Sequence, residues 1–160
     1  MKRLFDLGAS FFGLILLTPI FVLVSFCIMI DSKGPIFFRQ ERVGFQGNTF
    51  RIHKFRTMVL DAEKKGKQIT VCADSRITNA GRFLREYKID ELPQLFDVFA
   101  GDMSIVGPRP EVPKYIDYYS DNEKKEILSV KPGITDNASI EFINENDLFA
   151  SSMDPETVYI

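Results

Sequence analysis

The sequence contains little histidine and little cysteine, and this scarcity excludes several kinds of catalytic site. Its 160 residues include one histidine, His53, and two cysteines, Cys27 and Cys72. The cysteines form no CxxC pair and offer no disulfide framework. A zinc site built on several histidines is excluded, and no nucleophile motif surrounds His53. A metal ion here would be a hard cation held by carboxylates, such as magnesium.

A long apolar segment lies near the start of the chain. Residues 11–30, FFGLILLTPIFVLVSFCIMI, carry no charge. About 20 apolar residues are enough for a helix to cross a bilayer core. The segment exceeds the apolar part of a usual signal peptide and no A-x-A-like cleavage site follows it, so we expect it to be retained.

Two features of this segment predict that it enters the membrane and returns on the same side. Thr18-Pro19 lies near its centre, where proline kinks or breaks a helix. Basic residues flank both ends, as is typical of cytoplasmic flanks: Lys2, Arg3, Lys33, Arg39 and Arg42. We therefore predict a re-entrant helix-break-helix with its break at Thr18 and Pro19. The alternative is one spanning helix with a proline kink.

The charge balance argues against nucleic acid as a partner. The net charge is −2 and the pI is near 5.5, whereas nucleic-acid-binding domains are usually strongly basic. Residues 1–60 hold eight Lys/Arg and three Asp/Glu, and residues 61–160 hold twelve and nineteen. The basic part flanks the apolar segment, where it can meet anionic lipid headgroups.

The rest of the chain predicts a mixture of helices and one hairpin. Its expected elements, identified from apolar spacing, proline, glycine and a Ser120–Glu123 capping box, are a hairpin over 34–58 turning at Gly44–Asn48, a polar loop over 61–75, a helix over 79–89, a helix from near Asp90 to Gly101, and a helix from 120 to about 130. Residues 134–160 give no clear pattern. The fold class is thus α+β, with residues 1–30 in the membrane and residues 31–160 forming one integrated cytosol-facing unit.

An acidic pair, Asp90-Glu91, lies at the predicted start of a helix. Free amide hydrogens and the helix dipole favour an anion there, so we expect an ionised carboxylate that can act as a nucleophile or a metal ligand. The alternative is that Asp90 is simply a helix N-cap.

Basic side chains occur where they can surround this pair. Arginine's planar fork suits bidentate contact with phosphate, although each cation taken alone could equally form a surface salt bridge. Two prolines restrict the backbone around one of them. The candidates for binding phosphate or nucleotide are Lys54, Arg56, Arg85 and the loop Pro108-Arg109-Pro110.

Several motifs resemble the bacterial sugar transferases, which are small monotopic phosphoglycosyl transferases. They follow the family order from residue 2 to about residue 135: Lys2-Arg3-Leu4-Phe5-Asp6, Gly34-Pro35 through Phe38, Lys54-Phe55-Arg56-Thr57-Met58, Gly81-Arg82-Phe83-Leu84-Arg85, Asp90-Glu91-Leu92-Pro93-Gln94-Leu95, Gly101-Asp102-Met103-Ser104, Val106-Gly107-Pro108-Arg109-Pro110 and Lys131-Pro132-Gly133-Ile134-Thr135. After Thr135 the chain departs from the family's usual Gly-x-x-Gln, and it ends at Ile160, earlier than most members.

The resemblance implies a reaction and a role for each motif. A phosphosugar would move from a UDP-sugar to undecaprenyl phosphate through a covalent aspartyl-phosphosugar, as the first membrane step of glycoconjugate synthesis. Asp90 would be the nucleophile, Glu91 would help hold Mg²⁺, Arg85 would contact phosphate, and the 108–110 loop would recognise the nucleotide. The implied location is the cytoplasmic face of the bacterial inner membrane. The competing hypothesis is a membrane-anchored nucleotide- or lipid-binding module without catalysis.

Overall fold

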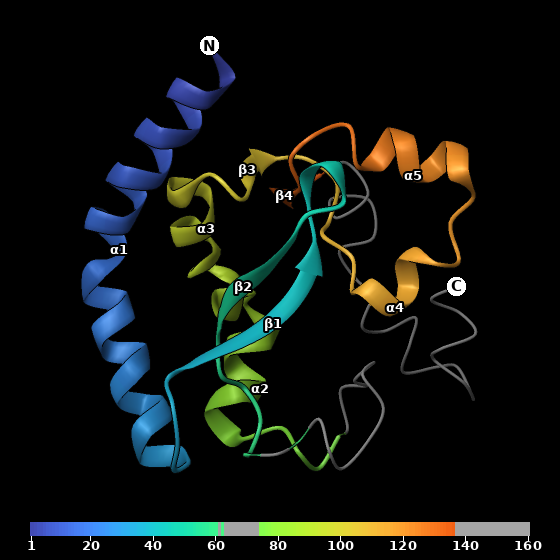
Figure 1. The fold of residues 1–160 in the computed structure, drawn as a ribbon. Helices are drawn as coiled ribbons and strands as arrows, with labels where there is room; N and C mark the ends of the chain where they lie inside the picture. Colours follow the sequence, from blue (N-terminus) through green and yellow to red (C-terminus); the bar gives the residue numbers. More distant parts are fainter. Residues whose placement is uncertain (61, 63–73, 137–160) are drawn as a thin grey trace.

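The computed structural model describes residues 1–60, 62 and 74–136 and shows a mixed helix and strand fold (Figure 1). Its elements, in chain order, are α1 (Lys2–Asp31), β1 (Phe37–Val43), η1 (Phe45–Gly47), β2 (Thr49–Phe55), α2 (Asn79–Glu86), η3 (Ile89–Glu91), α3 (Gln94–Ala100), β3 (Ser104–Val106), α4 (Pro113–Ile116), α5 (Asp121–Ile127) and β4 (Gly133–Thr135). The predicted combination of an apolar N-terminal helix with helices and strands is confirmed.

The apolar segment forms a single helix. α1 continues through Pro19, so the predicted break at Thr18-Pro19 is not confirmed. The Thr18 hydroxyl donates a hydrogen bond to the Leu14 carbonyl at 2.7 Å. In the part of the chain that the structure describes, α1 alone is long and apolar enough to cross a membrane, and most of its apolar side chains are exposed.

The rest of the structure packs along α1, with α3 and α2 beside it (Figure 1). Near the C-terminal end of α1, Val24 and Ile28 form one apolar cluster with Phe55 of β2 and Leu84 of α2. Because α1 contributes core residues, it is part of the folded unit and not only a tether. The division of the chain at residue 30 stays a prediction.

The N-terminal end of α1 is fixed by polar contacts. The Asp6 carboxylate is 3% exposed. It accepts hydrogen bonds from the Ser104 hydroxyl at 3.0 Å and from the Ile105 amide at 3.1 Å. Arg3 donates to the carbonyls of Val98 and Phe99 at the end of α3. These contacts explain why charged residues stand next to an apolar segment: they join α1 to β3 and α3.

The hairpin forms as predicted. β1 and β2 are antiparallel, with Phe37 opposite Phe55 and Val43 opposite Thr49. The turn lies at Gly44–Asn48, where the Gly44 amide donates to the Asn48 carbonyl. A second, parallel pair of strands, β3 and β4, was not predicted from the sequence. Each of these strands has three residues, which is too short for an alternating pattern to be recognised.

The helices agree with the sequence except around the acidic pair. α2 begins at Asn79 as predicted but ends at Glu86, before the expected residue 89. α5 begins with the expected capping box and ends at Ile127, before the expected residue 130. Asp90, however, lies in the short η3 turn, and α3 begins only at Gln94, after Pro93. Pro93 has no amide hydrogen to continue a helix across this point. Gly101 ends α3 with a φ of 101°. The loop over 61–75 and the segment 134–160 lie largely outside the described residues.

Replacing Asp6 tests the attachment of α1. Asp6→Ala removes the acceptor for the Ser104 hydroxyl and the Ile105 amide, and unsatisfied buried donors cost about 1–3 kcal/mol. We expect thermal unfolding in detergent to occur at a lower temperature, whereas Asp117→Ala, at an exposed position, leaves it unchanged. Equal unfolding temperatures for the two variants would contradict the anchoring role.

Candidate functional site

The acidic pair is buried and held by cations from distant parts of the chain. Asp90 is 8% exposed, and the side chain of Glu91 is 16% exposed. Glu91 Oε1 forms an ion pair with Lys54 Nζ of β2 at 2.6 Å and a longer one with Arg109 Nη2 at 3.3 Å. The hairpin, η3 and the Pro108–Pro110 loop therefore meet at Glu91.

These ion pairs keep Glu91 ionised. Burial alone would raise the pKa of Glu91, but Lys54 and Arg109 outweigh burial and lower it from 4.5 to about 2. The pKa of Lys54 is lowered because its burial has a greater effect than the neighbouring carboxylates, and Arg109 adds to the decrease. Glu91 is thus a carboxylate at any physiological pH, in contact with two cationic side chains.

Asp90 behaves differently from its neighbour. Burial raises its pKa, Lys54 and Arg85 lower it, and the adjacent Glu91 raises it further, with a net upward shift. This upward shift is opposite to the expectation from a helix start, because burial has the largest effect on Asp90. Asp90 also lies in η3 and not at the start of α3. Asp90 is a desolvated carboxyl group within the electrostatic reach of three cations, Lys54, Arg85 and Lys88.

The loop that carries Arg109 is fixed by backbone contacts. The Pro110 carbonyl accepts a hydrogen bond from Arg42 Nη1 of β1 at 2.9 Å, and the Pro108 carbonyl accepts one from the Gly133 amide at 2.9 Å. A Cβ on Gly133 would collide with the backbone of Gly107, so only glycine permits this approach. β1 and β4 together hold the loop in place.

A small polar pocket lies between these elements. Its volume is about 10 Å³, which is roughly the space for one water molecule. It is lined by Arg42, Ile52, Lys54, Glu91, Gln94, Arg109, Pro110, Gly133 and Ile134. The ion pairs of Glu91 with Lys54 and Arg109 leave no room for a larger anion. A diphosphate could enter only if these cations moved away from Glu91.

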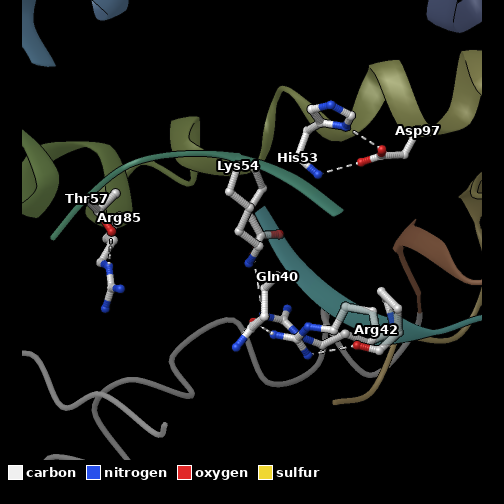
Figure 2. A network of polar contacts seen from close by, with 10 residues as sticks. Gln40, Arg42, His53, Lys54, Thr57, Arg85 and Asp97 are labelled. Atoms are coloured by element: carbon white, nitrogen blue, oxygen red, sulfur yellow. Dashed lines mark hydrogen bonds and ion pairs between the residues drawn. The ribbon is translucent and has the colours of Figure 1, made fainter. Parts of the chain in front are cut away.

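Arg85 of α2 lies apart from the ion pairs of Glu91. Its Nε donates to the Thr57 hydroxyl at 2.8 Å, and Figure 2 shows this pair apart from Lys54, beyond the end of β2. α2 lies so close to this segment that a Cβ on Gly81 would collide with the Thr57 carbonyl. The glycine, one helical turn before Arg85, permits the contact.

The structure gives Arg56 contacts that the sequence did not predict. Its side chain is buried and donates to the Ser32 and Lys33 carbonyls at the end of α1, at 2.7 and 3.0 Å. Cations at a helix C-terminus satisfy its last carbonyls and complement its dipole. Arg56 is therefore not brought to Glu91, and its role with phosphate stays a prediction. Thr18 and Pro19 lie within α1, outside this group.

His53 and Asp97 form a contact that the sequence reasoning missed. Asp97 is 2% exposed and accepts from the His53 amide at 2.8 Å, and its other oxygen lies 2.6 Å from His53 Nδ1. Figure 2 shows His53 and Lys54 pointing to opposite sides of β2. The pair ties β2 to α3. The sequence pattern that could have revealed this contact is a single aspartate, Asp97, among the apolar residues 95–100. Arg42 and Gln94, which line the polar pocket, stand in no such pattern.

Together these features define a small α+β unit built along one apolar helix, with a buried acidic pair held by cations. The chain belongs to the bacterial sugar transferase family, whose sequence model matches residues 1–160.

Curated relatives agree with this membership. The chain is 42% identical over 142 residues to the UDP-glucose:undecaprenyl-phosphate glucose-1-phosphate transferase of Klebsiella pneumoniae, a match that covers 87% of this chain and 30% of the relative. It is 40% identical over 158 residues to the undecaprenyl-phosphate glucose phosphotransferase of Komagataeibacter xylinus, covering 92% and 30%. A match to the UDP-N-acetylgalactosamine-undecaprenyl-phosphate N-acetylgalactosaminephosphotransferase of Aeromonas hydrophila is 39% identical over 138 residues and covers 84% and 32%. The chain thus spans about a third of the length of these three relatives.

Replacing Lys54 tests the electrostatics of the pair. In Lys54→Met the pKa of Glu91 should rise from about 2 towards 4.5, because the nearest cation is gone. In the wild type, ionised Glu91 stabilises the fold above about pH 4.5, and this contribution, on the order of 3 kcal/mol, is lost as pH falls towards 2.

The variant should therefore lose less stability across that interval. Carboxyl ¹³C NMR titration gives the pKa, and denaturant unfolding at several pH values gives the slope. Lys125→Met, at an exposed position of α5, should titrate like the wild type. A Glu91 pKa that stays near 2 in Lys54→Met would show that the ion pair does not set it.

Proposed function

We propose that this protein transfers a sugar 1-phosphate from a UDP-sugar to undecaprenyl phosphate. The observation that supports this most is a buried acidic pair surrounded by Lys54, Arg85 and Arg109 in a member of the bacterial sugar transferase family. The names of the relatives support the same donor and acceptor classes. They name different sugars, so the transferred sugar is left open.

In the proposed reaction Asp90 is the nucleophile. A carboxylate oxygen of Asp90 attacks the β-phosphorus of the donor, and the bond from this phosphorus to the bridging oxygen breaks. UMP leaves, and the phosphosugar remains as an acyl phosphate on Asp90. An oxygen of undecaprenyl phosphate then attacks the same phosphorus, which yields the polyprenyl diphosphate sugar and returns the carboxylate. Burial of Asp90 removes water that would otherwise solvate the nucleophile or hydrolyse the intermediate.

The surrounding cations position the donor. The diphosphate would draw Lys54 and Arg109 away from Glu91, which opens the small pocket between them. The Pro108–Arg109–Pro110 loop, held by Arg42 and Gly133, would contact the nucleotide. Phosphoryl transfer depends mainly on positioning and on neutralising charge, and these cations supply both.

Magnesium fits the residues present at this site. No cluster of three or more metal-ligating side chains occurs among residues 1–60, 62 and 74–136. Mg²⁺ is commonly held by one or two carboxylates together with substrate phosphates, and Glu91, ionised with both of its ion pairs on Oε1, is such a carboxylate. We propose that Glu91 holds Mg²⁺ with the donor, where the ion would neutralise charge on the diphosphate. Turnover that persists in excess chelator would remove the metal from the mechanism.

The proposed location is the cytoplasmic face of the bacterial inner membrane. α1 supplies the membrane segment. In the structure it is one continuous helix, so a re-entrant arrangement would need a break at Pro19 that the structure does not contain. Two observations support both ends being cytosolic: basic residues flank both ends, and Asp6 near one end and Ser32 at the other both bind the rest of the chain. This arrangement would hold Asp90 at the level where the acceptor presents its phosphate.

The covalent step is tested with Asp90→Asn. We expect this variant to fold and to lose UMP release by at least about a thousandfold, because an amide cannot form the acyl phosphate. Intact-mass analysis with the donor alone should detect a phosphosugar on the wild type and none on the variant. Asp117→Asn, at an exposed position, serves as the matched control. Wild-type activity in Asp90→Asn would remove Asp90 from the nucleophile's role.

The topology is tested by labelling single cysteines. Lys2→Cys and Lys33→Cys are each made in a background without Cys27 and Cys72, and intact cells are treated with a membrane-impermeant maleimide. The re-entrant arrangement predicts that neither position reacts until the cells are opened. Pro19→Leu should favour a span and expose position 2. If position 2 of the otherwise unchanged chain reacts from outside, α1 spans the membrane.

A further inference from the structure

A second cavity lies at the open end of the hairpin, with Arg85 of α2 on its wall, and its lining is more apolar than that of the polar pocket. Its volume is about 230 Å³. A cavity of roughly 150 Å³ with apolar walls is large enough for a benzene molecule. The walls are mostly apolar and come from both sides of the hairpin's open end: Pro35, Phe37, Phe38, Arg56, Thr57, Met58, Val59, Leu60, Ala62 and Arg85. The space suits a short stretch of hydrocarbon.

Two arginines give this apolar cavity a positive wall. Arg85 lies on it together with its partner Thr57. Arg56 is 5% exposed, and its Nε has no hydrogen-bond partner among the residues that the structure describes. An apolar space next to one buried and one half-buried arginine fits an amphiphile with an anionic head.

Two residues of the cavity wall relate it to α1 and to Asp90. Arg56 also binds the Ser32 and Lys33 carbonyls at the end of α1, so the cavity begins where the apolar helix ends. Arg85 lies close enough to Asp90 for its charge to oppose the upward shift of the Asp90 pKa. Asp90 is thus influenced by one cation from each pocket, Lys54 from the polar one and Arg85 from the apolar one.

We propose that this cavity binds the first isoprene units of the polyprenyl phosphate acceptor, with the acceptor's phosphate on Arg85. The inference rests on the proposed function and adds to it a division of the site. Donor and acceptor place their phosphates at the same carboxyl group, but the nucleotide extends along the Arg109 side and the hydrocarbon extends along the Phe37–Leu60 side. The two tails then never compete for the same space.

Val59→Trp tests the cavity by narrowing it. Val59 is on the cavity wall and is 39% exposed, so a larger side chain can be accommodated there. We expect the KM for undecaprenyl phosphate, measured in nanodiscs, to rise roughly tenfold, the equivalent of about 1.4 kcal/mol. The burst of UMP released with the donor alone should not change. The matched control is Val130→Trp, at a similarly exposed position away from the cavity.

Crosslinking gives a second measurement that does not need turnover or a variant. The probe is a polyprenyl phosphate with a diazirine on its first isoprene unit, and the wild type should be labelled within residues 56–60. An unchanged acceptor KM in a folded Val59→Trp, a weakened donor burst instead, or crosslinks confined to other segments would each overturn the proposal. If the wild type releases no UMP from any UDP-sugar, the proposed function fails, whereas the crosslinking still reports whether the cavity binds the lipid.

Discussion

The burial of two adjacent carboxyl groups is the constraint on which the arrangement of this protein depends. Asp90 and Glu91 are neighbours in sequence, and both are largely removed from water. Buried like charges raise each other's pKa, and isolated buried charges are costly. The structure meets this constraint unevenly. Glu91 receives the ion pairs and has a pKa of about 2, whereas Asp90 receives no ion pair from the described residues and its pKa is raised.

The cations that stabilise the pair come from segments that are far apart in sequence, and the fold brings these segments together. β2 carries Lys54, the loop after β3 carries Arg109, and α2 carries Arg85. Close backbone contacts at Gly81 and Gly133 let these segments approach, since a side chain at either position would collide with the neighbouring backbone. The His53–Asp97 contact fixes β2 against α3 and so holds Lys54 in register with the acidic pair.

In the proposed arrangement α1 is the segment that contacts lipid. Its ends are joined to the rest of the chain through Asp6 and Arg56, and its apolar surface is largely exposed. A polar pocket lined by Lys54 and an apolar cavity lined by Arg85 are also present, and both of these cations influence Asp90. Two separate pockets would suit the proposed reaction, because a water-soluble nucleotide sugar and a membrane-bound lipid phosphate share little besides their phosphates.

The elements with a local sequence pattern could be predicted from the sequence. The apolar run of α1, the hairpin turn at Gly44–Asn48, the α5 capping box and the end of α3 at Gly101 all follow from short-range rules. The motifs also identified the acidic pair and its candidate cations. Three other features became visible in the folded chain alone: the cations that reach Glu91, the contact of Arg56 with the end of α1, and the position of Asp90 in a turn with a raised pKa. The parallel pairing of β3 with β4 and the His53–Asp97 contact belong to the same group. The physical reason is that burial, ion pairing and close approach depend on distances between segments remote in sequence, which no local pattern specifies.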